Sequence, residues 1–282
     1  MSLYFIERCI LHIKKNGFLS FINNGFHHLT YIFNPKKIGE FPFSFFFKKK
    51  RMINRRFIKK NLLKFDHKYI ERYFNYYLDT SKIDSSPVVY TFGIGNQIKF
   101  EEIFANRFKD AKIFTYDPTS KNFIDSYTGP KNIKLFPYGL YTKDEKIKFY
   151  YLDNQMSGSI SNLYESKNKS LNIVKHQCYK LKTLMKMNNH YKLDILKIDI
   201  EGIAIEVLED IFNDDIFPNQ IVVEFEFSSN DNLSSKQITE FNSFELKLLN
   251  LLKKMQGLNY KAYNMPRLNT PYSSIEVLFV KT

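Results

Sequence analysis

The chain has 282 residues, of which 44% are hydrophobic, and its formal net charge is +13. This length and apolar content are enough for a buried core, so they exclude a largely disordered chain and favour one catalytic domain with a smaller attachment. No continuous apolar run approaches the roughly 18 residues of a membrane-spanning helix, and charged residues interrupt the first apolar stretch, unlike a secretory signal. Two cysteines, Cys9 and Cys178, make no disulfide framework. We therefore expect a cytoplasmic protein, with the inner face of the membrane as a second possible location.

The positive charge is concentrated near the N terminus. Residues 1–80 hold 16 Lys and Arg against 5 Asp and Glu, whereas residues 81–282 hold 26 against 24. The patch KKKRMINRR at 48–56 could face nucleic acid, an anionic membrane or a phosphorylated substrate, and a solvated helix face is an equally good interpretation. Because the apolar positions of 2–33 and 51–79 have roughly helical spacing, we predict a basic helical extension over residues 1–80.

From Val88 onward, strand patterns alternate with helical ones, which is typical of a parallel sheet with helical crossovers. A polar linker around Ser81 suggests that this second domain covers residues 81–282. Residues 153–170 are rich in Ser and Asn and are expected to form a loop. Strands are expected at 88–92, 111–117, 133–140, 146–152, 193–199, 220–227, 260–265 and 275–281, and helices at 98–108, 182–187, 203–212 and 238–255.

The first strand ends in a turn with two glycines, Gly93 and Gly95. Glycines at such a turn let the backbone approach a nucleotide-like ligand closely, and the helix that follows supplies free N–H donors. Asp117 follows Gly93 by 24 residues, about the spacing of an acid that binds ribose hydroxyls from the second strand. A nicotinamide dehydrogenase stays open as an alternative, although its fingerprint requires a third glycine where this chain has Ile98.

Carboxylates follow two of the central strands. LDILKIDIEG, residues 193–202, runs from an apolar strand into Asp199 and Glu201, and the next strand carries Glu224. Ligands bind at the carboxyl ends of such strands, so these acids could deprotonate a hydroxyl or hold a divalent metal. Capping of the following helix is the simpler interpretation of Asp199 alone. His176 is another candidate base, although a lone His before a helix is more often structural.

The ordered set FGIGN (92–96), YDPT (116–119), GL (139–140), LKIDIEG (196–202) and VVEFEF (222–227) resembles the FkbM-type S-adenosylmethionine-dependent methyltransferases. The resemblance covers roughly residues 85–282. It implies the class I methyltransferase fold, which is a Rossmann-like α/β fold. Its seven-stranded sheet is mostly parallel, and the antiparallel last strand is inserted between its neighbours by a hairpin.

The resemblance also implies roles for individual residues. Asp199 and Glu201 would lie where cofactor and acceptor meet, and Ile203 and Ala204 depart from the family, which usually has a small residue and then an acid there. The implied cofactor-binding residues are Phe92, Gly93, Gly95 and Asn96 along the methionine part, Asp117 at the ribose, Pro118 in the adenosine pocket, and Tyr138 and Gly139 near adenine.

Together these observations predict an S-adenosylmethionine-dependent O-methyltransferase. The acceptor implied by the resemblance is a hydroxyl of a sugar, nucleotide-activated or glycan-linked, as in bacterial surface polysaccharide biosynthesis. The competing hypothesis is a module that binds nucleic acid or a membrane through the basic segment. No nucleic-acid-binding signature accompanies that charge, so a peripheral membrane contact or substrate phosphates are the better partners for it.

Overall fold

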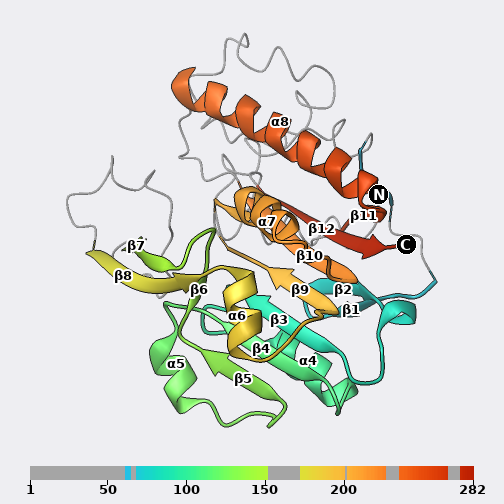
Figure 1. Ribbon diagram of the computed structural model, residues 1–282, viewed down its shortest axis with the longest axis vertical. Coiled ribbons are helices and arrows are strands. Elements are labelled where there is room, and N and C mark those ends of the chain that lie inside the picture. The colour runs from blue at the N-terminus through green and yellow to red at the C-terminus, as the bar shows by residue number, and fades with distance from the viewer. Residues whose placement is uncertain (1–60, 65–67, 152–171, 201, 227–234, 266–273) are drawn as a thin grey trace, which may run out of the picture. The chain divides into compact units, whose positions relative to one another are not determined.

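The computed structural model describes residues 61–64, 68–151, 172–200, 202–226, 235–265 and 274–282, with only the backbone described for 235–242 (Figure 1). The chain divides into two compact units, residues 1–50 and 51–282, and all described residues belong to the second. Most of the expected helical extension, including the basic patch at 48–56, therefore lies outside the described residues.

The described elements alternate between strands and helices along most of the chain. They are β1 (Ile70–Tyr73), β2 (Tyr76–Asp79), the 3-10 helix η2 (Thr80–Lys82), β3 (Val88–Phe92), α4 (Lys99–Arg107), β4 (Lys112–Tyr116), α5 (Lys121–Ser126), β5 (Ile133–Phe136), β6 (Gly139–Leu140), β7 (Glu145–Tyr151), β8 (Asn172–Tyr179), α6 (Leu181–Met187), β9 (Ile195–Ile198), α7 (Ala204–Asn213), β10 (Gln220–Glu226), α8 (Ser235–Gly257), β11 (Tyr260–Asn264) and β12 (Ser274–Lys281). No helix of this described part is long and apolar enough to cross a membrane.

The main sheet has seven strands in the order β11-β12-β10-β9-β3-β4-β5. Five consecutive strands, β10, β9, β3, β4 and β5, pair in parallel, and β12 runs antiparallel to both β10 and β11. The last strand is thus inserted between its neighbours by a hairpin, and the predicted class I methyltransferase fold is confirmed. The strand order changes direction beside β3, where β3 pairs with both β4 and β9, which is where open α/β sheets bind their ligands.

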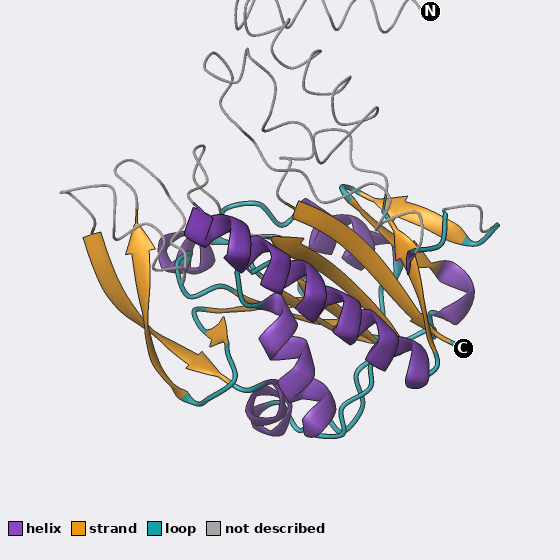
Figure 2. Cartoon of the chain, turned by 90° about the horizontal axis from the view of Figure 1, so that it is seen from above, coloured by secondary structure: helices purple, strands orange, loops and turns teal. Residues whose placement is uncertain are grey.

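Both faces of the sheet are covered, as a parallel sheet requires (Figure 2). Successive side chains of a strand point to opposite faces, so β9 contributes Leu196 and Ile198 to one core and Ile195 to the other. The first core is completed by α6, α7 and α8, and the second by α4 and the β1–β2 hairpin. Lys197 lies on the second face and is 3% exposed, so this side of the sheet carries a buried charge.

Residues 70–79 form a β-hairpin, and the helical prediction for this stretch is wrong. The spacing of its apolar residues fits a helix, but burial follows the strand period at Tyr76 and Leu78. The turn between the strands holds Phe74 at a φ of 56°. Tyr73 packs against Phe104 of α4 with ring centroids 5.6 Å apart, so the hairpin is part of the domain that we expected to begin near Ser81.

A second sheet of three strands, β6-β8-β7, lies beside the main one (Figure 1). The single strand expected over 133–140 is divided between the two sheets, with β5 in the main sheet and β6 in the smaller one. Pro137 lies between them and lacks the N–H that a continuous ladder needs. β8 was not expected. The loop predicted at 153–170 lies outside the described residues.

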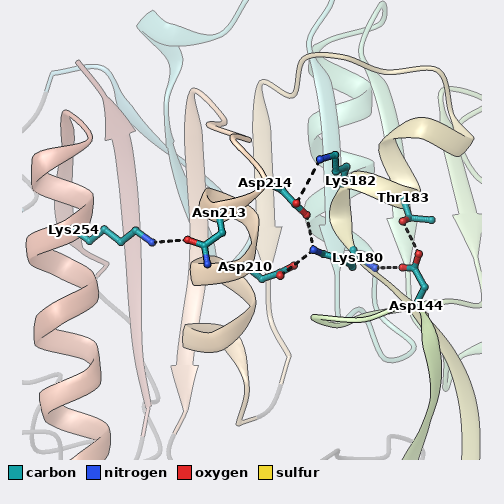
Figure 3. A network of polar contacts seen from close by, with 8 residues as sticks. All are labelled: Asp144, Lys180, Lys182, Thr183, Asp210, Asn213, Asp214 and Lys254. Carbon is teal, nitrogen blue, oxygen red and sulfur yellow. Dashed lines mark hydrogen bonds and ion pairs between the residues drawn. The ribbon is translucent and has the colours of Figure 1, made fainter.

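Polar contacts connect the three helices on the first face (Figure 3). Asp144 accepts hydrogen bonds from the backbone N–H of Lys180 at 2.8 Å and from the Thr183 hydroxyl at 2.7 Å, and so caps α6. The Lys180 ammonium pairs with Asp210 at 3.1 Å and Asp214 at 2.8 Å on α7. These pairs are partly exposed, so each contributes modestly, and together they set the position of α6 against α7.

Candidate active site

The turn after β3 contains two glycines with positive φ, 76° at Gly93 and 53° at Gly95. A Cβ on Gly93 would lie 1.7 Å from the backbone oxygen of Asp199, whereas a Cβ on Gly95 would meet nothing within 4 Å. The first glycine therefore allows two segments of the chain to pack together. The second leaves open space beside the backbone, as a close-fitting ligand requires.

Asp117 follows β4 and is 4% exposed. Its Oδ2 accepts hydrogen bonds from the backbone N–H groups of Ile94 at 3.0 Å and Gly95 at 2.8 Å. Its Oδ1 accepts from the backbone N–H and the hydroxyl of Thr119, both at 2.7 Å. The carboxylate thus holds the glycine turn in place. Because the Thr119 hydroxyl can rotate away, Oδ1 is the oxygen that could exchange a bond for a ribose hydroxyl.

The other predicted cofactor residues differ in what their side chains contact. Phe92 is 1% exposed and stacks on Tyr116 within the core, so its side chain is part of the packing. Gly139 lies against Cys178, whose sulfur would be 2.4 Å from an added Cβ. Asn96 is exposed beside Gly95, and Pro118 and Tyr138 are half-buried. An open turn, a buried carboxylate and a half-buried aromatic ring fit an adenosine cofactor, and the individual roles stay predictions.

Tyr151 and His176 were not among the predicted cofactor residues, yet both lie close enough to Asp117 to interact electrostatically with its carboxylate. The Tyr151 hydroxyl and His176 Nε2 are hydrogen-bonded at 2.6 Å. Burial lowers the pKa of His176, and the negative charge of Asp117 opposes that shift. Burial raises the pKa of Tyr151 to about 12, with Asp117 adding to the shift. The three-stranded sheet thus brings a neutral tyrosine–histidine pair to the side of the expected ribose site.

Asp199 lies directly after β9, and its backbone N–H donates to the Phe92 carbonyl at 3.0 Å. Its carboxylate Oδ2 accepts a hydrogen bond from the hydroxyl of Tyr76, which lies on the hairpin 123 residues earlier in the chain. In the described part of the chain Asp199 makes no helix cap, since the N-cap residue of α7 is Ile203. Asp199 is half-buried, and its backbone lies against the glycine turn.

Lys197 is a buried lysine on β9, two residues before Asp199. Its ammonium lies 3.4 Å from the carbonyl oxygen of Gly93, 3.8 Å from Oε1 of Glu101 on α4 and 4.7 Å from the ring centroid of Tyr76. It therefore connects the glycine turn, the following helix and the hairpin. Sequence reasoning missed both Lys197 and Tyr76. A lysine between leucine and isoleucine in a short buried strand could have indicated a buried, paired charge, because lysine is rarely buried without a partner. No local sequence pattern indicated that Tyr76 lies at the site.

Glu224 lies within β10, opposite Glu276 of β12, and is 8% exposed. Both glutamates act electrostatically on Tyr76, as Asp199 does, so Glu224 belongs to the group of acidic side chains around this tyrosine. Glu201 lies outside the described residues. Among the residues that are described, no group of three or more His, Cys, Asp or Glu is arranged to hold a metal ion.

A pocket of about 260 Å³ opens at the beginning of α7 and the end of β10. Its charged lining includes Glu206 and Lys247, which form an ion pair at 2.8 Å. Its remaining lining residues are Gly202, Ala204, Ile205, Phe225, Glu226, Ser243 and Phe244. The pocket therefore adjoins the segments that follow Asp199 and Glu224 in sequence.

A sequence model described as Methyltransferase FkbM domain matches residues 23–261. The chain belongs to the FkbM methyltransferase family. This FkbM protein is accordingly an S-adenosylmethionine-dependent methyltransferase, in agreement with the seven-stranded sheet and its inserted last strand. The match begins well before residue 81 and includes the β1–β2 hairpin, and it ends within β11, before β12. None of the curated proteins compared with the sequence matches it.

Solved structures similar to this FkbM protein include other methyltransferases. A fibrillarin/Nop5p complex aligns with 12% identity over 71% of this chain and 75% of that one, at a TM-score of 0.37. A precorrin-6y C5,15-methyltransferase from Geobacter metallireducens aligns with 10% identity over 72% of this chain and 84% of that one, at a TM-score of 0.32. Human N-acetylserotonin methyltransferase aligns with 12% identity over 71% of this chain and 50% of that one, at a TM-score of 0.35. With scores this low, the fold assignment depends on the family match and the strand order.

Proposed function

We propose that this protein methylates a hydroxyl group of a sugar, nucleotide-activated or glycan-linked, with Asp199 as the general base, in bacterial surface polysaccharide biosynthesis. S-adenosylmethionine, when bound, supplies an activated methyl group on a sulfonium sulfur. Asp117 and the turn at Gly95 would hold the cofactor, and Tyr138 would lie near its adenine. Transfer to an oxygen requires that the hydroxyl proton be removed as the new carbon–oxygen bond forms.

The observation that carries the proposal is the contact between the glycine turn and Asp199. The Asp199 backbone packs directly on Gly93, which brings this residue next to the turn at which the cofactor is expected, and its Oδ2 accepts a hydrogen bond from Tyr76. A carboxylate in this place can accept a proton from an acceptor hydroxyl. Most of the remaining rate enhancement would come from orienting the two reactants.

The pocket beside α7 supports a small acceptor. Its volume of about 260 Å³ lies below the roughly 300–1,000 Å³ usual for ligand pockets, so it suits only a small group such as one sugar ring. Phe244 is half-buried and offers apolar surface for a sugar ring, and the charged pair Glu206 and Lys247 can hydrogen-bond to hydroxyls or pair with a phosphate. Both kinds of contact suit a nucleotide-activated or glycan-linked sugar.

The test is a methyl-transfer screen with S-adenosylmethionine over a panel of nucleotide sugars and oligosaccharides, read by mass spectrometry. Asp199→Asn should lower turnover roughly 10²-fold or more, the usual contribution of a positioned general base, without loss of the fold. Asp194→Asn is the matched control. Asp194 precedes β9 and binds the backbone N–H of Val88 at 2.9 Å, so its replacement should affect stability and leave turnover intact. Equal turnover of parent and Asp199→Asn would contradict the assignment of the base.

A further inference from the structure

We propose that Tyr76, on the hairpin that precedes the sheet, is a positioning residue that orients the Asp199 carboxylate for proton removal. The inference depends on the proposed function, because it assigns a purpose to Asp199. It also makes the hairpin a functional part of the active site. Tyr76 itself acts only through the carboxylate that it holds.

The first argument is the fixed position of the phenol. Tyr76 is 7% exposed, and its ring meets Phe100 of α4 edge to face, with centroids 5.5 Å apart. The Lys197 ammonium lies over the ring, 4.7 Å from its centroid. A ring held in this way presents its hydroxyl in one direction, and that direction is toward Asp199 Oδ2.

The second argument is the protonation state of the phenol. Burial raises the pKa of Tyr76 well above its ordinary value, and the neighbouring carboxylates Asp199, Glu276 and Glu224 raise it further. Tyr76 therefore keeps its proton through the neutral pH range, and its hydroxyl remains a hydrogen-bond donor to Asp199. The bond occupies Oδ2, so Oδ1 is the oxygen that would take the proton of the acceptor hydroxyl.

The hairpin itself contains the matched control. Tyr73 is the direct cross-strand partner of Tyr76 and packs on the same helix. It is 1% exposed, and its hydroxyl oxygen has no hydrogen-bond partner among the described residues. Removing the hydroxyl of Tyr73 tests the general effect of Tyr→Phe in this hairpin, whereas removing that of Tyr76 also removes the bond to Asp199.

The experiment compares Tyr76→Phe and Tyr73→Phe in the full-length protein. With the best acceptor from the sugar panel, Tyr76→Phe should lower kcat at least tenfold and leave the acceptor KM and the affinity for S-adenosylhomocysteine within about twofold. The acid limb of its pH–rate profile should move to higher pH, because the charged carboxylate loses a donor that stabilises it. Lys197 from β9, Glu224 from β10 and Glu276 from β12 also face this pair and are unchanged in both variants. Tyr73→Phe should match the parent throughout.

A second measurement needs no acceptor. Urea midpoints of the parent, Tyr76→Phe, Asp199→Asn and the double variant form a double-mutant cycle, and a direct interaction predicts that the two shifts are not additive. Additive shifts would overturn the proposal, as would a kcat and a pH profile for Tyr76→Phe equal to those of Tyr73→Phe. A parent protein inactive on every sugar would refute the proposed acceptor, while the cycle would still decide whether Tyr76 holds Asp199.

Discussion

The backbone oxygen of Asp199 occupies the space in which a side chain on Gly93 would begin, 1.7 Å from the position of an added Cβ. Gly93→Ala must therefore push β9 away from β3, in addition to the strain of a positive φ. We expect a loss of about 2–5 kcal/mol in the free energy of unfolding, measured by urea denaturation.

Gly95→Ala is the companion variant. No atom lies within 4 Å of its added Cβ, so only the backbone strain of about 1–2 kcal/mol applies to stability. Its cofactor affinity should fall in calorimetry, because the methyl group enters the space expected for the ligand. Unchanged affinity in a folded Gly95→Ala protein would remove this turn from the cofactor site.

Asp117→Ala should impair both stability and binding. Its loss leaves the N–H groups of Ile94 and Gly95 without their acceptor, at about 1–3 kcal/mol for a buried donor, and removes the expected ribose contact. Thr119→Val is the control, because Asp117 then keeps its three backbone donors and loses one hydroxyl. Calorimetry with S-adenosylhomocysteine should show at least a tenfold loss for Asp117→Ala and little change for Thr119→Val. Parent-like binding by Asp117→Ala would rule out the ribose assignment.

Lys197→Met should be strongly destabilising. Glu101 is 1% exposed, and without Lys197 its charge is buried beside an apolar side chain, which costs about 3–5 kcal/mol. Adding Glu101→Gln removes that charge and should recover much of the loss in urea denaturation. A double variant as unstable as Lys197→Met alone would show that the two side chains do not interact.

Cys178 should be unreactive in the folded protein. Burial raises the pKa of its thiol to about 12, so at pH 8 roughly one molecule in 10⁴ carries the thiolate that attacks alkylating reagents. Peptide mapping after iodoacetamide treatment should find Cys178 unmodified under native conditions and modified in urea. Equal labelling in both conditions would contradict the buried position against Gly139.

The sequence predicted the order of strands and helices well and the contacts between distant residues poorly. Alternating strands and helices from Val88 onward were readable because each element buries a regular set of its own residues. The antiparallel position of β12 was expected from the family resemblance and was confirmed by its pairing with β10 and β11. The glycine turn was predicted as a whole. That Gly93 serves chain packing while Gly95 leaves space becomes visible only when β9 is placed beside it.

The polar residues beneath the site were harder to predict because their partners are far apart in the sequence. Tyr76 and Asp199 are separated by 123 residues, and the hairpin's apolar spacing resembles a helix. Lys197 belongs to the KIDIEG motif, but its relation to Glu101 depends on how α4 packs on the sheet. Such contacts are properties of the assembled fold and leave no local pattern.

The hairpin is made early but is bonded to a residue that the ribosome adds much later. Asp79, at its end, bonds through its backbone to the side chain of Gln220 at 2.8 Å and 2.9 Å, across 141 residues. At roughly 5–20 residues per second, the ribosome needs about 7–28 s to make that intervening chain. Until then Tyr73 and Tyr76 can pack on α4, but the later strands that complete the same core, which contribute Val222 and Leu278, are still missing. The carboxylate at Asp199 acquires its phenolic donor only after most of the domain has been translated.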